Sequence, residues 1–399
     1  MNIELEKNYQ AIKSYLDNGD LNRTGIHLMD TLYNHSFPED MRQQAIQLRI
    51  KYNSEKDLDR LKVTGEALAL DYQKFFSLIS TIDAQAYSTE KQRILTAKNI
   101  SKSYRSQLRS FTLEPIDLEL FHGKIIGIVG ENGNGKTTLL RMIAGDLSSN
   151  SGEVTYYFNS EEETDWSVIK QKIAFIPQRI KRWYGSAIDN LSFVAATKGI
   201  QHPENKEKVD FIIHRLGLTN FRDHTWNQLS SGYRLRVEIA KALVWSPRIL
   251  ILDEPLANLD INSQELMLDD LRNIADSIRN PTGIILSSQQ LHEVEKISDQ
   301  IIFLKNGRAV FNGDVHDMAK DNGINIIEIS GSFDLAALSE IFSDWKDVNI
   351  EPTVKAFQIT FPDTYSKHDL LQRISVHKLD VAYYRDITNS TKKLFNDKY

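Results

Sequence analysis

The chain has 399 residues, a mass of 45.8 kDa, 41% hydrophobic residues, a net charge of -6 at pH 7 and a pI near 6.0. The acidic balance argues against a general nucleic-acid binder, which is usually basic, and the length predicts about two to three domains. The absence of cysteine excludes disulfides and thiolate metal sites and fits a reducing compartment. The sequence predicts no signal peptide and no membrane span, which needs about 20 apolar residues, so we expect another chain to span any membrane at which this protein works.

Residues 1–88 read as a bundle of four or five helices. The first stretch carries apolar residues at helical spacing, namely Leu5, Tyr9, Ile12 and Leu16. Asn18-Gly19 ends that helix, Pro38 lies where a first helical turn tolerates proline, and the last stretch runs from 55 to 82. Short helices broken at Asn-Gly loosely resemble the death-like, effector-associated helical domains of some bacterial multidomain proteins. We expect either a domain of that kind that binds a protein partner, or a helical extension whose partner the sequence does not identify.

Residues 84–92 are polar and lack periodicity, so we place a domain boundary there. From residue 93 the pattern changes to strands, and residues 111–120 show the alternation of a half-exposed strand. Fully apolar strands return at 249–252 and 283–286, as in a parallel sheet that is covered on both faces. Further strands are expected at 94–97, 152–157, 172–176, 300–304 and 308–311, with mostly helix over 187–245. The middle of the chain therefore reads as an α/β domain.

A glycine-rich loop, residues 130–138, directly follows the apolar run 124–129. A buried strand, a Gly-rich loop and then a helix beginning at Lys136 are the features of a P-loop NTPase. Glycines let backbone N–H groups point at phosphate oxygens, and the helix N-terminus adds its positive end. Lys136 is expected to reach the β- and γ-phosphates, and the Thr137 hydroxyl to bind Mg²⁺. The expected phosphate-binding residues are Gly130, Asn132, Gly133, Asn134, Gly135, Lys136, Thr137 and Thr138.

The apolar strand 249–252 ends in two carboxylates, Asp253 and Glu254. In a P-loop enzyme the first carboxylate reaches Mg²⁺, directly or through water, at the carboxyl end of the strand. Because side chains alternate along a strand, Glu254 points toward the γ-phosphate side, where a carboxylate polarises the attacking water as a general base. The sequence therefore predicts Asp253 as a metal ligand and Glu254 as a catalytic residue.

Leu229-Ser230-Ser231-Gly232-Tyr233 resembles the signature segment of ATP-binding cassette (ABC) ATPases, which is usually Leu-Ser-Gly-Gly-Gln. The order along the chain agrees with that family: an aromatic residue, the phosphate loop, a Gln loop, the signature, the acidic strand and then Leu256–Asp260. The resemblance covers residues 93–318. It implies an α/β P-loop NTPase, an ABC ATPase core with a helical subdomain, that dimerises around two ATP with Mg²⁺ and drives a separate transmembrane subunit. The second protomer is a copy of this chain or a paralogue.

The resemblance also implies roles for individual residues. Tyr104 would stack on adenine, the alternative being an ordinary tyrosine at a strand end. Gln178 would bind Mg²⁺ or its water and would mark where the helical subdomain touches a membrane subunit. Ser230 and Gly232 would contact the γ-phosphate held by the opposite protomer, while Leu256–Asp260 would cross the dimer interface.

Two departures from the family pattern bear on the rate of hydrolysis. Ser231 and Tyr233 replace the first glycine and the glutamine of the signature. Gln289 stands where the family's switch residue is usually histidine, and an amide donates an N–H but never becomes a cation. His292, one helical turn further on, is an alternative switch residue. We therefore expect a competent but slow ATPase in which Gln289 acts together with Glu254 and Lys136.

Basic and aromatic residues alternate in 179–185, directly after Gln178. Such a run binds nucleic acid in other proteins, whereas in the ABC family it borders the groove that receives a coupling helix of the membrane subunit. We favour the groove because the chain is acidic, and we expect no nucleic-acid partner.

Residues 323–399 follow a strand–helix–strand–strand–helix–strand order, which is typical of a ferredoxin-like α+β fold. This stretch has no phosphate loop or acid pair, so we expect a regulatory or dimer-supporting appendage. Residues 384–395 resemble the end of transporter cassettes of the drug- or ion-export type. That resemblance implies an exporter subunit on the cytoplasmic face of the membrane.

A second function stays open. A bare transporter cassette needs no helical domain at residues 1–88, so the chain also fits a soluble ABC-type ATPase switch that recruits a protein partner in signalling or assembly. Co-purification with a membrane protein would separate the two functions.

Overall fold

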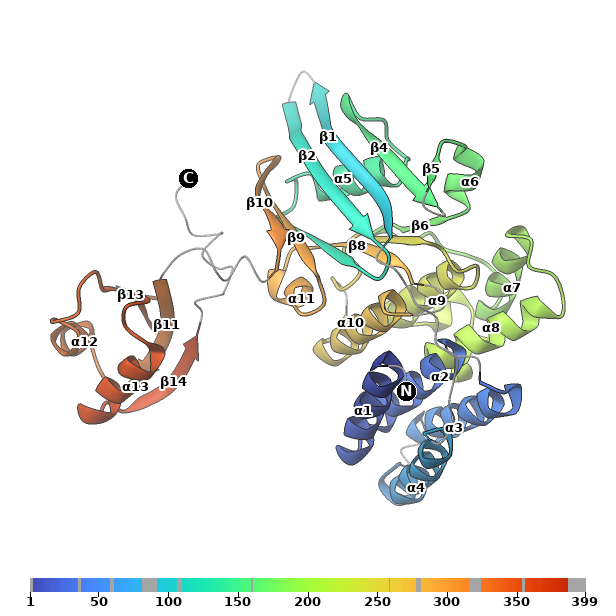
Figure 1. The fold of residues 1–399 in the computed structure, drawn as a ribbon, viewed down its shortest axis with the longest axis horizontal. Helices are drawn as coiled ribbons and strands as arrows, with labels where there is room; N and C mark the ends of the chain where they lie inside the picture. The colour runs from blue at the N-terminus through green and yellow to red at the C-terminus, as the bar shows by residue number, and fades with distance from the viewer. Residues whose placement is uncertain are drawn as a thin grey trace. The chain divides into compact units, whose positions relative to one another are not determined.

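The computed structural model describes residues 3–34, 37–57, 61–80, 92–105, 110–158, 161–257, 259–277, 281–315, 324–353 and 356–386. The chain divides into two compact units, residues 1–311 and 312–399 (Figure 1). Asn258 of the expected interface segment, the expected boundary up to residue 91 and the tail from residue 387 lie outside the described residues.

The first unit begins with a four-helix bundle made of α1 (Ile3–Asp17), α2 (Leu21–Asn34), α3 (Glu39–Asp57) and α4 (Leu61–Ile79). The apolar positions predicted from the first helix are all buried, because the 3.6-residue period places them on one face. Gly25 allows close packing of α2, since a Cβ there would lie 2.6 Å from the Tyr72 hydroxyl. The predicted bundle is present. The start expected at residue 55 was wrong, because no helix breaker stops α3 before Asp57.

A six-stranded sheet forms the centre of the unit, in the order β10-β9-β3-β8-β7-β6. Its strands are β3 (Ile125–Val129), β6 (Ile173–Ile176), β7 (Ile249–Leu252), β8 (Gly283–Ser288), β9 (Gln300–Lys305) and β10 (Arg308–Asp314). β6, β7, β8, β3 and β9 pair in parallel, and β3, β7 and β8 are wholly buried. The fully apolar runs therefore form the covered parallel strands that the sequence predicted.

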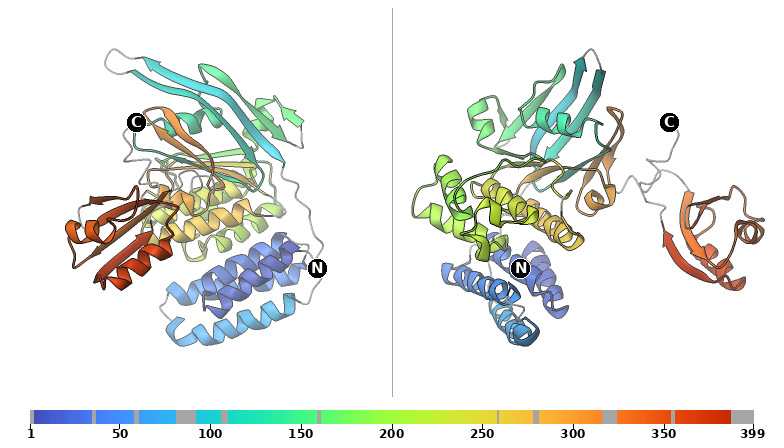
Figure 2. Two further views of the ribbon diagram at one scale, coloured as in Figure 1. Left: turned by 60° about the vertical axis from the view of Figure 1, so that its left-hand side comes forward. Right: turned by 180° about the vertical axis from the view of Figure 1, so that it is seen from behind.

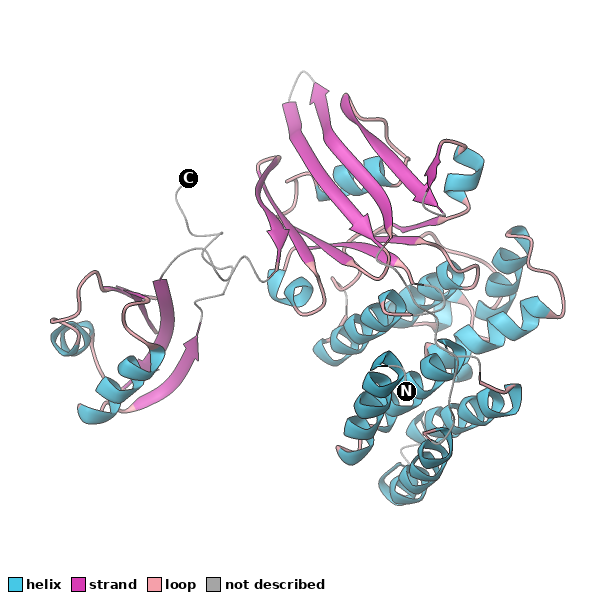
Figure 3. Ribbon diagram, viewed as in Figure 1, coloured by secondary structure: helices cyan, strands magenta, loops and turns pink. Residues whose placement is uncertain are grey.

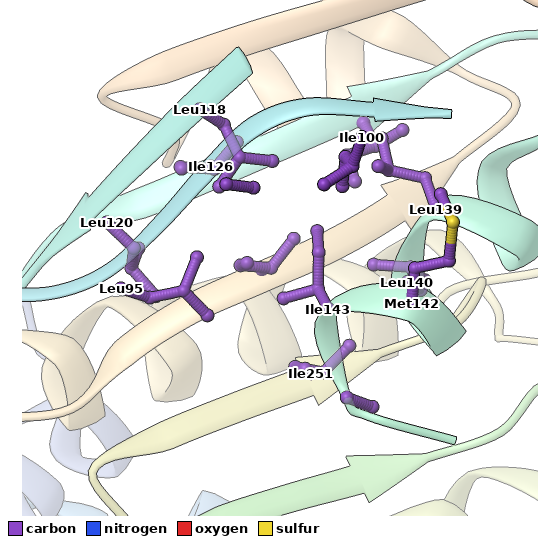
Figure 4. Close-up of a cluster of buried hydrophobic side chains, with 14 of the residues drawn as sticks. Leu95, Ile100, Leu118, Leu120, Ile126, Leu139, Leu140, Met142, Ile143 and Ile251 are labelled. Atoms are coloured by element: carbon purple, nitrogen blue, oxygen red, sulfur yellow. The ribbon is translucent and has the colours of Figure 1, made fainter. Parts of the chain in front are cut away.

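A second sheet, in the order β2-β1-β4-β5, lies over the central one and encloses α5 (Lys136–Ile143) (Figure 3). Its strands are β1 (Arg93–Arg105), β2 (Ser110–Phe121), β4 (Ser151–Phe158) and β5 (Glu161–Glu163). Figure 4 shows side chains from β1 and β2, α5 and the central sheet gathered in one apolar core. Those labelled include Leu95, Ile100, Leu118, Leu120, Ile126, Leu139, Leu140, Met142, Ile143 and Ile251. This core fixes the start of α5, and therefore the loop before it.

Helices fill the other side of the central sheet. They are α7 (Ala187–Thr197), α8 (Glu204–Arg215), α9 (Ser231–Leu243), α10 (Ile261–Ala275) and α11 (Leu291–Glu295), with short 3₁₀ turns η1 (Thr219–Phe221) and η2 (Trp226–Gln228). The short helix α6 (Trp166–Lys170) lies instead beside α5 and β4, where Ile169 joins the core between the sheets. The views in Figures 1 and 2 place the bundle α1–α4 against α8, α9 and α10. In the described parts of the chain, no helix combines the length and apolar character that crossing a membrane requires.

The second unit consists of β11 (Ile324–Gly331), α12 (Leu335–Ile341), β12 (Asn349–Pro352), β13 (Phe357–Pro362), α13 (Lys367–Val376) and β14 (Val381–Asp386). Its antiparallel sheet has the order β12-β13-β11-β14, which is the ferredoxin-like order. The two helices cover one apolar core that includes Ile327, Leu338 and Phe361. The predicted element order is therefore confirmed.

Candidate active site

The phosphate loop joins β3 to α5 and depends on glycine at its last position. Gly135 has φ +100°, and a Cβ there would lie 2.8 Å from Leu113 and 2.9 Å from Phe111, both on β2. The Asn134 side chain donates to the Leu304 carbonyl at 3.2 Å and accepts from the Asn306 N–H at 3.0 Å. That side chain therefore ties the loop to the β9–β10 turn.

Lys136 begins α5 and is almost fully buried. Its ammonium donates to the Gly130 carbonyl at 2.6 Å and the Glu131 carbonyl at 3.2 Å, and it lies 3.1 Å from Oε1 of Glu254. The loop thus folds around this cation, which places it among the backbone N–H groups expected to meet phosphate oxygens. Gly130, Asn132, Gly133 and Thr138 lie in the same loop or the first turn of α5.

Asp253 follows β7 and joins the loop to the sheet. Its Oδ2 accepts a 2.7 Å hydrogen bond from the Thr137 hydroxyl, and its Oδ1 accepts one of 2.7 Å from Ser287 at the end of β8. The Ser287 hydroxyl also accepts from the Glu254 N–H at 2.9 Å. Sequence reasoning missed Ser287, although it lies two residues before Gln289 and its strand neighbours β7, which was the available signal.

The residues present fit Mg²⁺. Thr137 and Asp253 bring a hydroxyl and a carboxylate oxygen within 2.7 Å of each other at the edge of the phosphate loop. Mg²⁺ prefers oxygen ligands and is usually held by one or two protein groups together with substrate phosphates. Two protein oxygens beside a phosphate-binding loop therefore match that donor set.

Glu254 is the point where three expected site residues meet. Its Oε2 accepts hydrogen bonds from the Gln178 amide at 2.7 Å and the Gln289 amide at 2.8 Å, while Lys136 lies against its other oxygen. The Glu254 backbone has φ +47°, a conformation that costs energy for a non-glycine residue and is concentrated at functional sites. The exposed His292 lies on α11, so Gln289 is the residue of this segment that reaches the carboxylate.

Ser230 caps the N-terminus of α9, where its hydroxyl accepts from the Tyr233 N–H at 3.4 Å. The Tyr233 ring packs against Phe221 of η1, with ring centroids 3.8 Å apart. The bulk expected at this position therefore lies against the helical subdomain. Gly232 packs closely on Leu259, because a Cβ there would lie 3.1 Å from that side chain.

The structure does not bring the signature to the phosphate loop. Ser230 is exposed, and with Gly232 it lines a cavity beside α2 and α3. Gln178, Asp253 and Glu254 line a second cavity, to which the signature contributes Ser231 and which shares Leu259 with the first. Tyr104 is 41% exposed at the end of β1. Its strand partner is Phe111, the residue that a Cβ at 135 would touch, so Tyr104 lies on the side of the phosphate loop.

Comparisons with known proteins bear on the family of the chain. The family model described as ABC transporter matches residues 113–257. The phosphonates import ATP-binding protein PhnC of Treponema denticola is 31% identical over 232 residues, which are 55% of this chain and 89% of that protein. The Fe(3+) ions import ATP-binding protein FbpC of Mannheimia succiniciproducens is 27% identical over 278 residues, 69% of this chain and 75% of that protein.

Among solved structures, cbiO1 from Clostridium perfringens, described as part of the ABC transporter complex cbiONQ, superposes with a TM-score of 0.51 and 25% identity. The match covers 58% of this chain and 92% of that one. The similarity thus extends over 75% to 92% of each of these proteins. The chain therefore belongs to the ABC transporter family, as an ATP-binding subunit that binds ATP with Mg²⁺ and hydrolyses it.

Proposed function

We propose that two copies of the chain, or one copy and a paralogue, close face to face around two ATP molecules. The observation that carries this proposal is the division of the site. Lys136, Thr137, Asp253 and Glu254 converge in one place, whereas the exposed Ser230 and Gly232 line a different cavity and only Ser231 of the signature borders the cavity of Asp253 and Glu254. A second chain would bring its signature to the first chain's phosphate loop and complete the site.

Each residue then has a defined part in hydrolysis. Lys136 binds the β- and γ-phosphates, and Tyr104 stacks on the adenine. Thr137, Asp253 and Gln178 would hold Mg²⁺, directly or through water, which supplies charge neutralisation at the phosphates when bound. Glu254 accepts the proton of the attacking water, and the amides of Gln178 and Gln289 hold its carboxylate in place.

The opposite protomer would stabilise the γ-phosphate. Ser230 supplies a hydroxyl and Gly232 a backbone N–H at the N-terminus of α9, where the helix dipole favours an anion. Because these groups lie on the other chain, closure of the dimer requires ATP and its release follows hydrolysis. A separate transmembrane subunit would turn that opening and closing into transport.

The docking surface that we propose for the transmembrane subunit lies just after Gln178. Tyr184 is 83% exposed and Phe193 is 68% exposed, which is unusual for aromatic side chains. Asn190 donates to the Tyr184 carbonyl at 2.7 Å, and Phe193 lies one turn further along the same helix, α7. Since Gln178 bonds to Glu254, a helix bound here would sense the state of the catalytic carboxylate.

We further propose that the transporter is an exporter and that this subunit lies on the cytoplasmic face of the membrane. The support is the ferredoxin-like appendage and the following tail, which resembles the end of export-type cassettes. The relatives named above are import subunits by name, so transport assays with the partner in inside-out and right-side-out vesicles decide the direction. Residues 323–399 would serve regulation or support the dimer.

Complementation between two inactive variants tests the dimer. Lys136→Ala disables the phosphate loop and Ser230→Arg disables the signature, so each variant alone has no competent site. In a mixed dimer, the phosphate loop of the second variant faces the signature of the first, and that one site is intact. We expect ATPase activity to return on mixing. A Ser230→Arg variant with full activity alone would exclude the shared site, and activity that stays absent in the mixture would exclude a site shared between two copies of this chain.

The second candidate function is a soluble ABC-type ATPase switch. The observation that favours it is the bundle α1–α4, which has its own apolar core and would recruit a protein partner in signalling or assembly. Purification of the full-length chain from its source decides between the two. A transmembrane protein in the complex supports the transporter, and a soluble protein retained through residues 1–88 supports the switch.

A further inference from the structure

Buried charged residues join the N-terminal bundle to the ATPase core. Arg215 at the end of α8 forms a two-pronged ion pair with Asp30 of α2, with N–O distances of 2.5 and 2.7 Å. Both side chains are largely buried, at 6% and 14% exposure. A buried ion pair loses its stabilising effect when one partner is removed, because the other charge is left uncompensated. The bundle is therefore fixed to α8 by an interaction that is costly to break.

The charges continue from this pair to the signature helix. Arg236 of α9 lies 3.8 Å from Asp270 of α10, and it donates to the Leu216 carbonyl at 2.9 Å. Arg49 of α3 is 2% exposed, and its guanidinium and that of Arg236 both lie beside Gly217, each 3.7 Å from where a Cβ would stand. Together Asp30, Arg49, Arg215, Arg236 and Asp270 form what we call the junction cluster.

Within the described residues, neither carboxylate oxygen of Asp270 accepts a hydrogen bond. Burial raises the pKa of Asp270, whereas the neighbouring Arg236, Arg215 and Arg49 lower it. Arg49 of the bundle is thus one of the cations that favour the charged form of Asp270. Asp270 lies on α10, the helix that follows the proposed interface segment 256–260. Removing the charge of Arg49 or Asp30 in the bundle therefore changes the electrostatic environment of Asp270 in the ATPase core.

The signature loop lies next to this cluster. Arg49, Arg236 and Asp270 line a cavity of about 130 Å³ together with Ser230, Gly232 and Leu259. The loop therefore borders a polar cavity on this side and is not seated on a close-packed apolar core. The position of the signature loop depends on the positions of α9 and α10, because α9 carries Arg236 and α10 carries Asp270 of the junction cluster.

Two more contacts join the bundle to the ATPase core. Arg23 of α2 donates to Asp269 of α10 at 2.5 Å, and Asn53 of α3 donates to Thr219 of η1 at 3.3 Å. Thr219 in turn bonds to the His214 ring at 3.0 Å. α2 and α3 thus contact α8, η1 and α10, so the bundle is built into the helical side of the ATPase.

We propose that the N-terminal bundle is a positioning element for the signature, and that Asp30 and Arg49 are positioning residues for hydrolysis at the site on the opposite protomer. This inference rests on the proposed function, in which Ser230 and Gly232 act across the dimer. The junction cluster sets the place of α9, and α9 carries the signature at its N-terminus. A bundle that only recruits a partner would affect protein levels and localisation, and would leave hydrolysis unchanged.

The test compares Asp30→Asn with a matched control in the full-length chain. Asp71→Asn makes the same carboxylate-to-amide change in the bundle, at the exposed Lys51–Asp71 pair away from the junction. Three quantities are measured for each variant: ATP affinity of the separate chains, ATP-dependent dimerisation in the Glu254→Gln background, and steady-state ATPase turnover. Arg23→Gln, which breaks the more exposed contact to Asp269, provides a second junction variant if Asp30→Asn does not fold.

We expect Asp30→Asn to leave ATP affinity within about twofold and to reduce turnover and dimerisation by about tenfold or more, because small displacements of a positioned group cost one to two orders of magnitude. Asp30→Glu should restore most of the turnover, and Asp71→Asn should match wild type. Unchanged turnover in both junction variants overturns the inference, and so does an equal loss of ATP affinity and turnover. Wild-type protein that neither dimerises with ATP nor complements in mixed dimers overturns the proposed function instead.

Discussion

The Lys136 ammonium lies 3.1 Å from the Glu254 carboxylate, and both side chains are buried. The cation that we propose to bind the phosphates is thus paired, in the chain itself, with the carboxylate that we propose to activate water. Phosphate oxygens compete with Glu254 for this ammonium when a nucleotide binds. We therefore expect nucleotide binding to weaken the Lys136–Glu254 ion pair and to leave the Glu254 carboxylate with the two amide donors of Gln178 and Gln289.

Glu254→Gln removes the base and keeps the side-chain volume. We expect ATP binding to persist and hydrolysis to fall by about 10²-fold or more, because a positioned general base contributes that factor. The variant should accumulate as an ATP-bound dimer. Turnover and size-exclusion chromatography with ATP and Mg²⁺ measure both effects. Glu265→Gln on the surface of α10 is the control. Hydrolysis at the wild-type rate in Glu254→Gln would show that Glu254 is not the general base.

Gln289→His tests whether the amide limits the rate. The Gln289 amide donates to Glu254, and an imidazole at this position would donate as well and also become a cation. We expect faster steady-state turnover than in wild type, with a new pH dependence near the ordinary histidine pKa of about 6.5. His292→Gln serves as the comparison, because His292 is exposed on α11. No increase in Gln289→His would show that another step limits turnover.

Strong local patterns made the core of the site predictable. The apolar runs before Gly130 and before Asp253 had to be buried parallel strands, and such strands place their carboxyl ends at one edge of the sheet. The loop and the two acids were therefore expected to meet, and the Thr137–Asp253 bond shows that they lie together. The ferredoxin-like order followed from alternating strand and helix patterns in the same way.

The junction of the bundle with the ATPase had no such local signal. Asp30 and Arg215 are 185 residues apart, and each looks in the sequence like an ordinary charged residue of a solvated helix face. The left-handed conformation of Glu254 was equally hidden, because a strand pattern predicts extended backbone up to its last residue. Tertiary packing decides both features, and a local pattern does not contain it.

Gly135→Ala and Gly133→Ala distinguish two reasons for glycine in the phosphate loop, the lack of room for a Cβ and the positive φ of the backbone. Both glycines have positive φ, which costs about 1–2 kcal/mol for other residues, but only a Cβ at 135 meets side chains, while a Cβ at 133 has nothing within 4 Å. We expect Gly135→Ala to lose more ATP affinity and to have the lower Tm. Nucleotide titration and thermal unfolding measure these. Equal effects of the two substitutions would mean that φ alone matters.

Tyr184→Ser and Phe193→Ser test the docking surface for the transmembrane subunit. Both side chains are largely exposed, so the ATPase activity of the isolated protein should stay within about twofold of wild type, as for surface substitutions in general. Binding to the membrane subunit should fall, because exposed aromatic residues are typical anchors of protein interfaces. Val376→Ser is the control, since Val376 is 68% exposed, as Phe193 is, and belongs to the ferredoxin-like unit. Co-purification of the membrane subunit with each variant gives the measurement. Full retention in the Tyr184→Ser, Phe193→Ser double variant would place the docking surface elsewhere.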